Sequence, residues 1–158
     1  MAANTLIIDL PSVDATADFA MQIGAKLMMG DTLLLAGDVG AGKTFFARAL
    51  ITSLLIEAED IPSPTFTLVQ TYDTRSGPLW HADLYRLSSD YEIEELGLVD
   101  AMTDAICLIE WPDRLGEYTP QNALNIALSA GTSDDARSMV VSWTDPQWND
   151  AMKDWQND

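Results

Sequence analysis

The feature that most constrains this chain is a glycine-rich segment between a short apolar run and a helix-like pattern. Residues 37–44 read Gly-Asp-Val-Gly-Ala-Gly-Lys-Thr, a complete match to G-x-x-x-x-G-K-S/T. The apolar run 32–36 precedes it, and residues 45–51, Phe-Phe-Ala-Arg-Ala-Leu-Ile, follow it. This order predicts a buried strand, a loop and a helix, which is the setting of a phosphate-binding loop in an α/β fold.

The residue types in this segment suit a triphosphate. Glycines let the backbone turn tightly and point N–H groups at phosphate, and a helix beginning near Gly42 adds the positive end of its dipole. Lys43 is expected to bind the β- and γ-phosphates, and the Thr44 hydroxyl to bind Mg²⁺. The predicted nucleotide-binding residues of the loop are Gly37, Asp38, Val39, Gly40, Ala41, Gly42, Lys43 and Thr44. The alternative is a glycine-rich turn before a core helix.

Strand and helix patterns alternate along the rest of the chain. We expect helices after Ser12, from Lys43 to about Glu57, and from the capping pair Ser89 and Glu92. The predicted strands are residues 5–10, 32–36, 65–72, 79–83, 105–109, 124–128 and 138–143. The expected fold is a single α/β domain over residues 1–158, a P-loop NTPase-like three-layer structure with a mostly parallel mixed sheet and an antiparallel hairpin. Residues 145–158 are expected to dock as a short helix or to fray.

Charge and composition narrow the possible partners. With 8 basic and 25 acidic residues the formal net charge is −17, which argues against direct binding of DNA or tRNA. A basic partner surface or a saline habitat would explain this acidity. The single cysteine, Cys107, cannot form an intramolecular disulfide and is expected in the core. The sequence shows no signal peptide and no apolar run of the ~20 residues that cross a bilayer, so we expect a cytoplasmic protein.

Two carboxylates follow predicted strands, where a magnesium site needs acidic groups. Glu110 follows the apolar run 105–109, and Asp83 ends the less apolar run 79–82. Either could instead be a solvated carboxylate at a strand end. Thr65 lies close to two prolines and could meet the γ-phosphate as a switch does. The spacing alone favours an ordinary turn residue at least as strongly.

Other candidate residues have ordinary structural interpretations from the sequence alone. Trp111 could stack on a base, but a core position is favoured. His81 is the only histidine, and inside a strand it is interpreted as a structural group. Arg48 and Arg86 could touch phosphate, with surface ion pairing as the default.

Five segments together resemble the bacterial tRNA threonylcarbamoyladenosine biosynthesis ATPase family, TsaE. They are residues 37–44 (GDVGAGKT), 63–69 (SPTFTLV), 81–87 (HADLYRL), 95–97 (ELG) and 109–112 (IEWP). The resemblance extends from about Leu10 to Leu128, and the last thirty residues do not contribute to it. S-P-T-F/Y-T, H-x-D-L-Y-R-L and a strand ending in E-W-P make the combination far more specific than the loop alone.

The resemblance implies an ATPase with the cofactors ATP and Mg²⁺ that supports threonylcarbamoyladenosine formation with the partners TsaB and TsaD, and that meets tRNA only through them. It implies catalytic roles for Lys43, Asp83 and Glu110, and a switch position for Thr65. Thr44, Glu110 and Asp83 would surround the metal, and Trp111 would lie near the nucleotide. Asp83 as general base and Glu110 as magnesium anchor is the preferred assignment, with the reverse left open.

Three other classes of protein share parts of this sequence pattern. A GTPase would need an N-K-x-D segment to read the base, and the sequence has none. A small-molecule kinase would need arginines in a mobile lid, whereas the five arginines are scattered singly. The third alternative is a nucleotide-gated regulatory binding protein with little hydrolysis of its own. Its weak activity in isolation would look similar to that of the expected ATPase.

Overall fold

The computed structural model describes residues 4–38, 41–62, 68–87 and 91–155. Four residues singled out by the sequence, Val39, Gly40, Thr65 and the predicted helix cap Ser89, lie outside these ranges.

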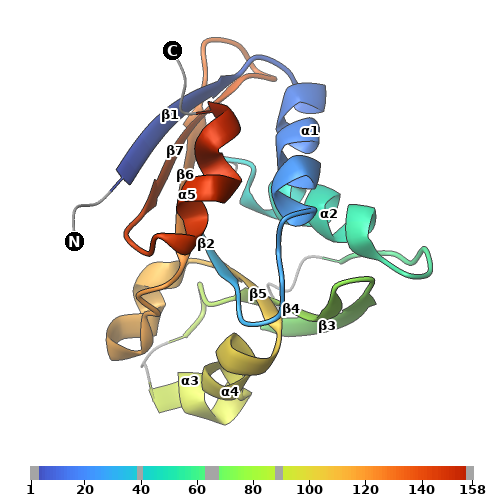
Figure 1. Ribbon diagram of the computed structural model, residues 1–158, viewed down its shortest axis with the longest axis vertical. Coiled ribbons are helices and arrows are strands. Elements are labelled where there is room, and N and C mark those ends of the chain that lie inside the picture. The colour runs from blue at the N-terminus through green and yellow to red at the C-terminus, as the bar shows by residue number, and fades with distance from the viewer. Residues whose placement is uncertain (1–3, 39–40, 63–67, 88–90, 156–158) are drawn as a thin grey trace.

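Seven strands form one sheet in the part of the chain that the structure describes, in the order β1-β7-β6-β2-β5-β4-β3 (Figure 1). They are β1 (Asn4–Leu10), β2 (Thr32–Ala36), β3 (Val69–Thr74), β4 (Gly77–Asp83), β5 (Ile106–Glu110), β6 (Leu124–Ala130) and β7 (Arg137–Trp143). The central strands β6, β2, β5 and β4 pair in parallel, whereas β7 and β3 pair antiparallel to their neighbours. Because β1 is antiparallel to β7, it shares the direction of the central strands. The mixed, mostly parallel sheet and the β3–β4 hairpin are confirmed.

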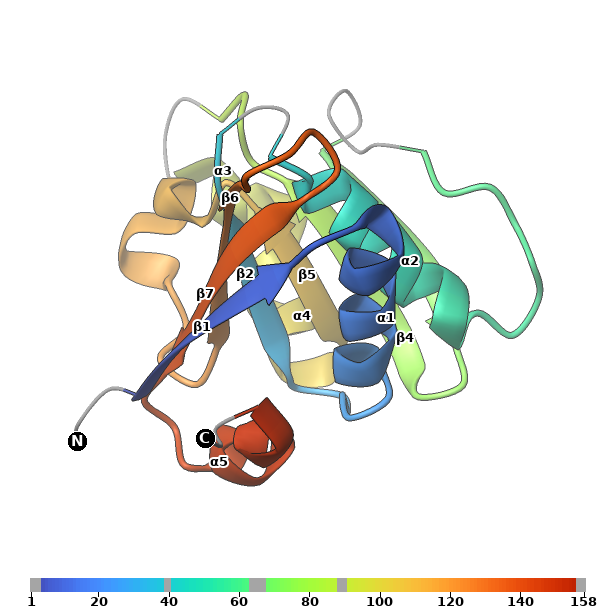
Figure 2. The same ribbon diagram turned by 90° about the horizontal axis from the view of Figure 1, so that it is seen from above.

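Helices cover both faces of the sheet, which gives the expected three layers. The α-helices are α1 (Val13–Gly24), α2 (Lys43–Leu54), α3 (Tyr91–Leu96), α4 (Leu98–Asp104) and α5 (Gln147–Met152), and the 3₁₀ helices are η1 (Pro112–Tyr118) and η2 (Lys153–Trp155). One apolar core joins the sheet to α1, α2 and α5, and a second lies under α3, α4 and η1. Figures 1 and 2 both show α1 and α2 side by side. Among the described residues, no helix has the length and apolar character that spanning a membrane requires.

Local sequence signals explain several element boundaries. The Ser12 side chain accepts a hydrogen bond from the Ala15 N–H at 3.1 Å, which caps α1 as expected. Helix α2 ends at Leu54, before the predicted Glu57, because Leu55 turns extended and bridges to Thr74 of the hairpin. In the described part of the chain, strand β3 begins at Val69, directly after Leu68, which has a left-handed φ of 68°. The predicted start of this strand at residue 65 lies outside the described residues.

Gly97 ends one helix and begins another. Its left-handed φ of 80° ends α3. The same residue is the N-cap of α4, a helix that the sequence pattern did not indicate. The short α4 was missed because its few residues give too little periodicity to recognise.

The C-terminal segment docks on the sheet. Trp148 and Met152 of α5 are buried in the core beneath α1, and the Trp155 ring lies edge-on to Phe19 with centroids 4.9 Å apart. The Lys26 ammonium donates to the Ala151 carbonyl at 2.7 Å. Residues 147–155, the described part of this segment, therefore form short helices that pack against the core.

Candidate nucleotide-binding site

The parallel strands bring the predicted loop and carboxylates to one edge of the sheet. The loop follows β2, Glu110 ends β5 and Asp83 ends β4, and these strands are neighbours. In the strand register Glu110 is paired with Leu35 on one side and with Asp83 on the other. Ligands of open α/β sheets bind at this carboxyl edge. Residues separated by more than sixty positions in the sequence thus share one site.

The loop backbone takes conformations that favour glycine. Gly37 has φ of 141° and Gly42 has φ of 106°. A Cβ atom on Gly37 would lie 2.5 Å from the Leu128 carbonyl oxygen of β6, so only glycine fits there. Gly42 then opens α2, whose first N–H groups face the loop. The loop Gly37–Asp38 and Ala41–Thr44, as far as it is described, has the geometry expected of a phosphate cradle.

Lys43 lies folded over the loop. Its ammonium donates to the Gly37 carbonyl and, at 3.0 Å, to the Asp38 carbonyl, and the side chain is only 5% exposed. The ammonium also lies 4.1 Å from the centre of the Trp111 ring. Burial lowers the pKa of Lys43 from its usual 10.5, and the Glu110, Asp83 and Asp38 carboxylates oppose this shift. The cation is thus surrounded by acceptors at the place where phosphate oxygens are expected.

Thr44 and Glu110 are in direct contact. The Thr44 hydroxyl donates to Glu110, with Oγ1 at 2.9 Å from Oε1 and 3.2 Å from Oε2. A hydroxyl that gives its proton to a carboxylate keeps its oxygen lone pairs available for a cation. Glu110 is 2% exposed and is also bonded to the His81 Nε2 at 2.7 Å.

Asp83 is the second buried carboxylate, with 4% of its surface exposed. Its Oδ1 accepts the Tyr85 N–H at 3.0 Å, which fixes the turn after β4. Within the described ranges, no three His, Cys, Asp or Glu side chains cluster closely enough to hold a metal alone. One hydroxyl and two carboxylates are hard oxygen donors, and they suit Mg²⁺, which takes few protein ligands and completes its shell with phosphate and water. The donor set therefore fits this metal.

Trp111 is placed beside the loop, half-buried against the second core. It has a left-handed φ of 59°, its backbone N–H donates to the Leu35 carbonyl at 3.3 Å, and its ring centroid lies 4.8 Å from that of Tyr85. Trp111 therefore packs against the core, as the sequence favoured, and also lies next to the phosphate loop.

Two residues that the sequence did not assign to the site contact it in the structure. His81, interpreted as a structural group, contacts Glu110. Arg137 at the start of β7 donates from Nε to the Ala41 carbonyl at 2.9 Å, which ties the β6–β7 hairpin to the loop, and no local motif signals this contact across the sequence. By contrast, Arg48 donates from Nε to the Ile61 carbonyl at 2.7 Å.

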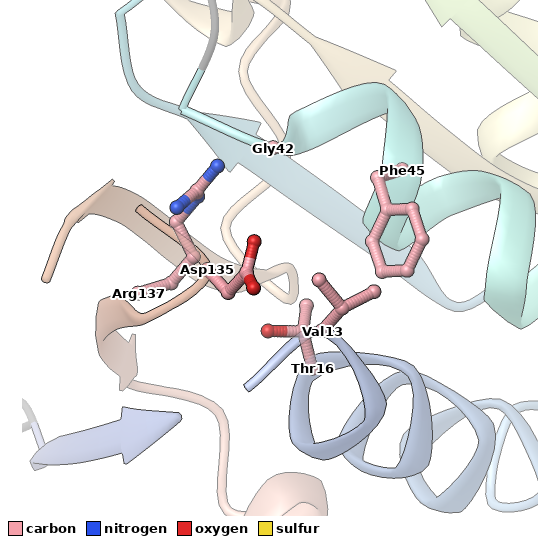
Figure 3. A pocket seen from close by; sticks show the side chains of 6 residues that line it. All are labelled: Val13, Thr16, Gly42, Phe45, Asp135 and Arg137. Atoms are coloured by element: carbon pink, nitrogen blue, oxygen red, sulfur yellow. The ribbon is translucent and has the colours of Figure 1, made fainter. Parts of the chain in front are cut away.

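A pocket of about 190 Å³ adjoins the loop where α2 begins. Figure 3 shows Val13 and Thr16 of α1 and Phe45 of α2 on one side, with Asp135 and Arg137 opposite. Gly42 lies at its upper margin and connects it to the phosphate loop. The pocket combines apolar side chains with a carboxylate and a guanidinium.

Known proteins are similar to this chain in sequence. Residues 10–139 match the family model described as threonylcarbamoyl adenosine biosynthesis protein TsaE. The tRNA threonylcarbamoyladenosine biosynthesis protein TsaE of Rickettsia bellii is 41% identical over 128 residues, which cover 81% of this chain and 88% of that protein. The protein of the same name from Mycobacterium tuberculosis is 33% identical over 143 residues, covering 85% and 84%.

A solved structure has a similar fold. The crystal structure of Bacillus subtilis YdiB superposes with a TM-score of 0.79 at 26% identity, covering 98% of this chain and 96% of that one. The family match spans the phosphate loop, both carboxylates and most of the sheet. The chain belongs to the TsaE family, which takes part in the biosynthesis of threonylcarbamoyladenosine in tRNA.

Proposed function

We propose that this chain binds Mg-ATP and hydrolyses it in the cytoplasm, in support of threonylcarbamoyladenosine formation carried out with TsaB and TsaD. The observation that carries the proposal is the convergence of Lys43 and Thr44 with Glu110 and Asp83 at one edge of the sheet. A phosphate loop alone supports binding. Two buried carboxylates beside it add the groups that hydrolysis needs.

Each residue has a role that follows from its position. The loop N–H groups and the α2 N-terminus would hold the phosphate chain, and the Lys43 ammonium would move from the loop carbonyls to the β- and γ-phosphates. Thr44 and Glu110 would hold Mg²⁺, which when bound neutralises the charge that develops on the phosphoryl oxygens. Glu110 suits the anchor role because its carboxylate already accepts the Thr44 hydroxyl. Asp83 is the remaining buried carboxylate and would take a proton from the attacking water.

The pocket beside Gly42 would receive the nucleoside. Apolar contacts from Val13 and Phe45 would cover the base, and the guanidinium of Arg137 lies between the pocket and the Ala41 carbonyl. This placement leaves the γ-phosphate at the opposite end of the loop, beside Glu110 and Trp111. Adenine is assigned by the family resemblance.

The strong acidity supports a partner-dependent role. A chain with a net charge of −17 repels the tRNA backbone, so contact with tRNA would occur through TsaB and TsaD. The chemistry on the adenosine would then lie in the partners, and this chain would supply energy to the cycle.

ATP turnover, measured alone and with TsaB and TsaD, tests the proposal. We expect slow hydrolysis alone and stimulation in the complex. Lys43→Ala, Glu110→Ala and Asp83→Ala should each lower turnover about 100-fold or more, since each removes one charged group from the reacting phosphate. Lys153→Ala, an exposed lysine far along the chain, is the matched control and should leave turnover unchanged.

Three results would count against parts of the proposal. Unchanged ATP affinity and turnover in Lys43→Ala would exclude the phosphate site. Normal turnover in Glu110→Ala or Asp83→Ala would remove that carboxylate from the mechanism. ATP binding with no hydrolysis under any partner condition would instead favour a nucleotide-gated regulatory binding protein.

A further inference from the structure

His81 lies beneath the proposed metal site and has no role in the reaction described above. It is two residues before Asp83 on β4, so both side chains project from the same face of the sheet. Its partner in the strand register is Leu108, two residues before Glu110 on β5. The side chain is fully buried, and its Nε2 lies 2.7 Å from Oε2 of Glu110.

The two ring nitrogens have different surroundings. Nε2 faces a carboxylate oxygen, which can only accept a hydrogen bond when ionised, whereas Nδ1 has no hydrogen-bond partner among the described residues. The neutral ring with its hydrogen on Nε2 satisfies this arrangement, because Nδ1 then carries only a lone pair and needs no acceptor. On this assignment, made from the hydrogen-bond network, the ring acts as a fixed donor to Glu110.

With the contact from His81, each oxygen of the Glu110 carboxylate has a hydrogen-bond donor. Oε1 accepts the Thr44 hydroxyl at 2.9 Å, from α2, and Oε2 accepts His81, from β4. With His81 removed, Oε2 would keep, among the described residues, only the longer 3.2 Å contact with the same hydroxyl. Carboxylates that hold metals depend on such partners for their orientation, and loss of one lowers metal affinity by about 10- to 100-fold.

We propose that His81 is a positioning residue that orients Glu110 toward the metal of the bound nucleotide. The proposal rests on the proposed function of this site. His81 touches neither nucleotide nor metal in this role and acts only through Glu110. If His81 only filled space in the core, a side chain of similar size could replace it without loss of metal affinity.

The test compares variants that keep or lose the donor at the Nε2 position. His81→Gln can place an amide N–H close to that position, His81→Asn reaches only the position of Nδ1, and His81→Met fills a similar volume without a donor. The metal probe is Mn²⁺, whose binding to the ADP complex is followed by electron paramagnetic resonance. ADP binding without metal and thermal unfolding are measured on the same samples.

We expect His81→Met to weaken Mn²⁺ binding about 10- to 100-fold and to leave metal-free ADP affinity within about 3-fold. His81→Gln should restore most of the Mn²⁺ affinity, and His81→Asn should not. If His81→Met does not fold, the comparison of Gln with Asn decides, since both are small polar amides. Equal Mn²⁺ affinity in Gln and Asn, or full affinity in Met, would overturn the proposal.

The same experiment separates this inference from the proposed function. Wild-type protein that binds ADP but takes up no Mn²⁺ would contradict the magnesium site and the positioning role together. Wild-type protein that takes up Mn²⁺, with equal affinity in the His81 variants, would contradict the positioning role alone.

Discussion

Gly37→Ala is expected to damage the phosphate loop more than Gly42→Ala does. Gly37 has φ of 141°, a backbone conformation that residues with a Cβ atom rarely adopt. The added Cβ would lie 2.5 Å from the carbonyl oxygen of Leu128, where ordinary contact begins at 3.4 Å. That oxygen is backbone on β6, and Leu128 is paired with Met139 of β7, so the obstacle cannot swing aside.

The cost has two parts. Holding alanine in this backbone region costs about 1–3 kcal/mol. Relieving the clash by shifting packed backbone costs about 1–3 kcal/mol more. Gly42→Ala is the matched control, because Gly42 has φ of 106° but its Cβ would meet only the flexible Arg137 side chain at 3.4 Å. Gly42→Ala should therefore show the backbone part alone, and Gly37→Ala should be less stable by about 1–3 kcal/mol.

Urea unfolding of both variants without nucleotide measures this difference in free energy. The Gly37 carbonyl also accepts a hydrogen bond from Lys43, so titration of ATP should show weaker binding in Gly37→Ala. Free energies of unfolding for the two variants that agree within about 0.5 kcal/mol would refute the argument from the Leu128 contact.

Three further changes test other parts of the structure. Burial raises the pKa of the Cys107 thiol from 9.0 to about 12, so the folded state keeps a proton that the unfolded chain loses. The free energy of unfolding should therefore fall from pH 9 toward pH 12, by up to about 1.4 kcal/mol per pH unit. Urea unfolding at pH 8 and pH 10 should show a larger fall in wild type than in Cys107→Ala. An equal fall in the two proteins would contradict burial of the thiol. Trp148→Ala removes a 3% exposed ring whose Nε1 donates to the Asn122 carbonyl, and should lower the free energy of unfolding by about 3–5 kcal/mol; a loss below about 1 kcal/mol would argue against the docked tail. Ser12→Ala should lose about 1 kcal/mol through the α1 cap and Ser12→Asp should not, as thermal unfolding would show; equal losses would exclude a capping role.

Local patterns in the sequence were sufficient for much of the fold. The run before Gly37 became the buried strand β2, Ser12 capped α1, and the alternating residues near 69–83 became a hairpin. Each of these depends on neighbours within a few residues. Where the tertiary surroundings intervened the predictions were less accurate, as in the earlier end of α2 at Leu54, which follows from pairing of the next residue with the hairpin.

The candidate site divides in the same way. The sequence by itself determined the loop, its lysine and threonine, and two carboxylates at strand ends, because motif spacing and strand polarity fix these locally. Only the tertiary structure decided that Asp83 and Glu110 are register partners, that His81 contacts Glu110, and that Arg137 reaches the loop from β7. The physical reason is that strand order and register bring distant residues together, and one amino-acid sequence does not directly specify which strands are neighbours.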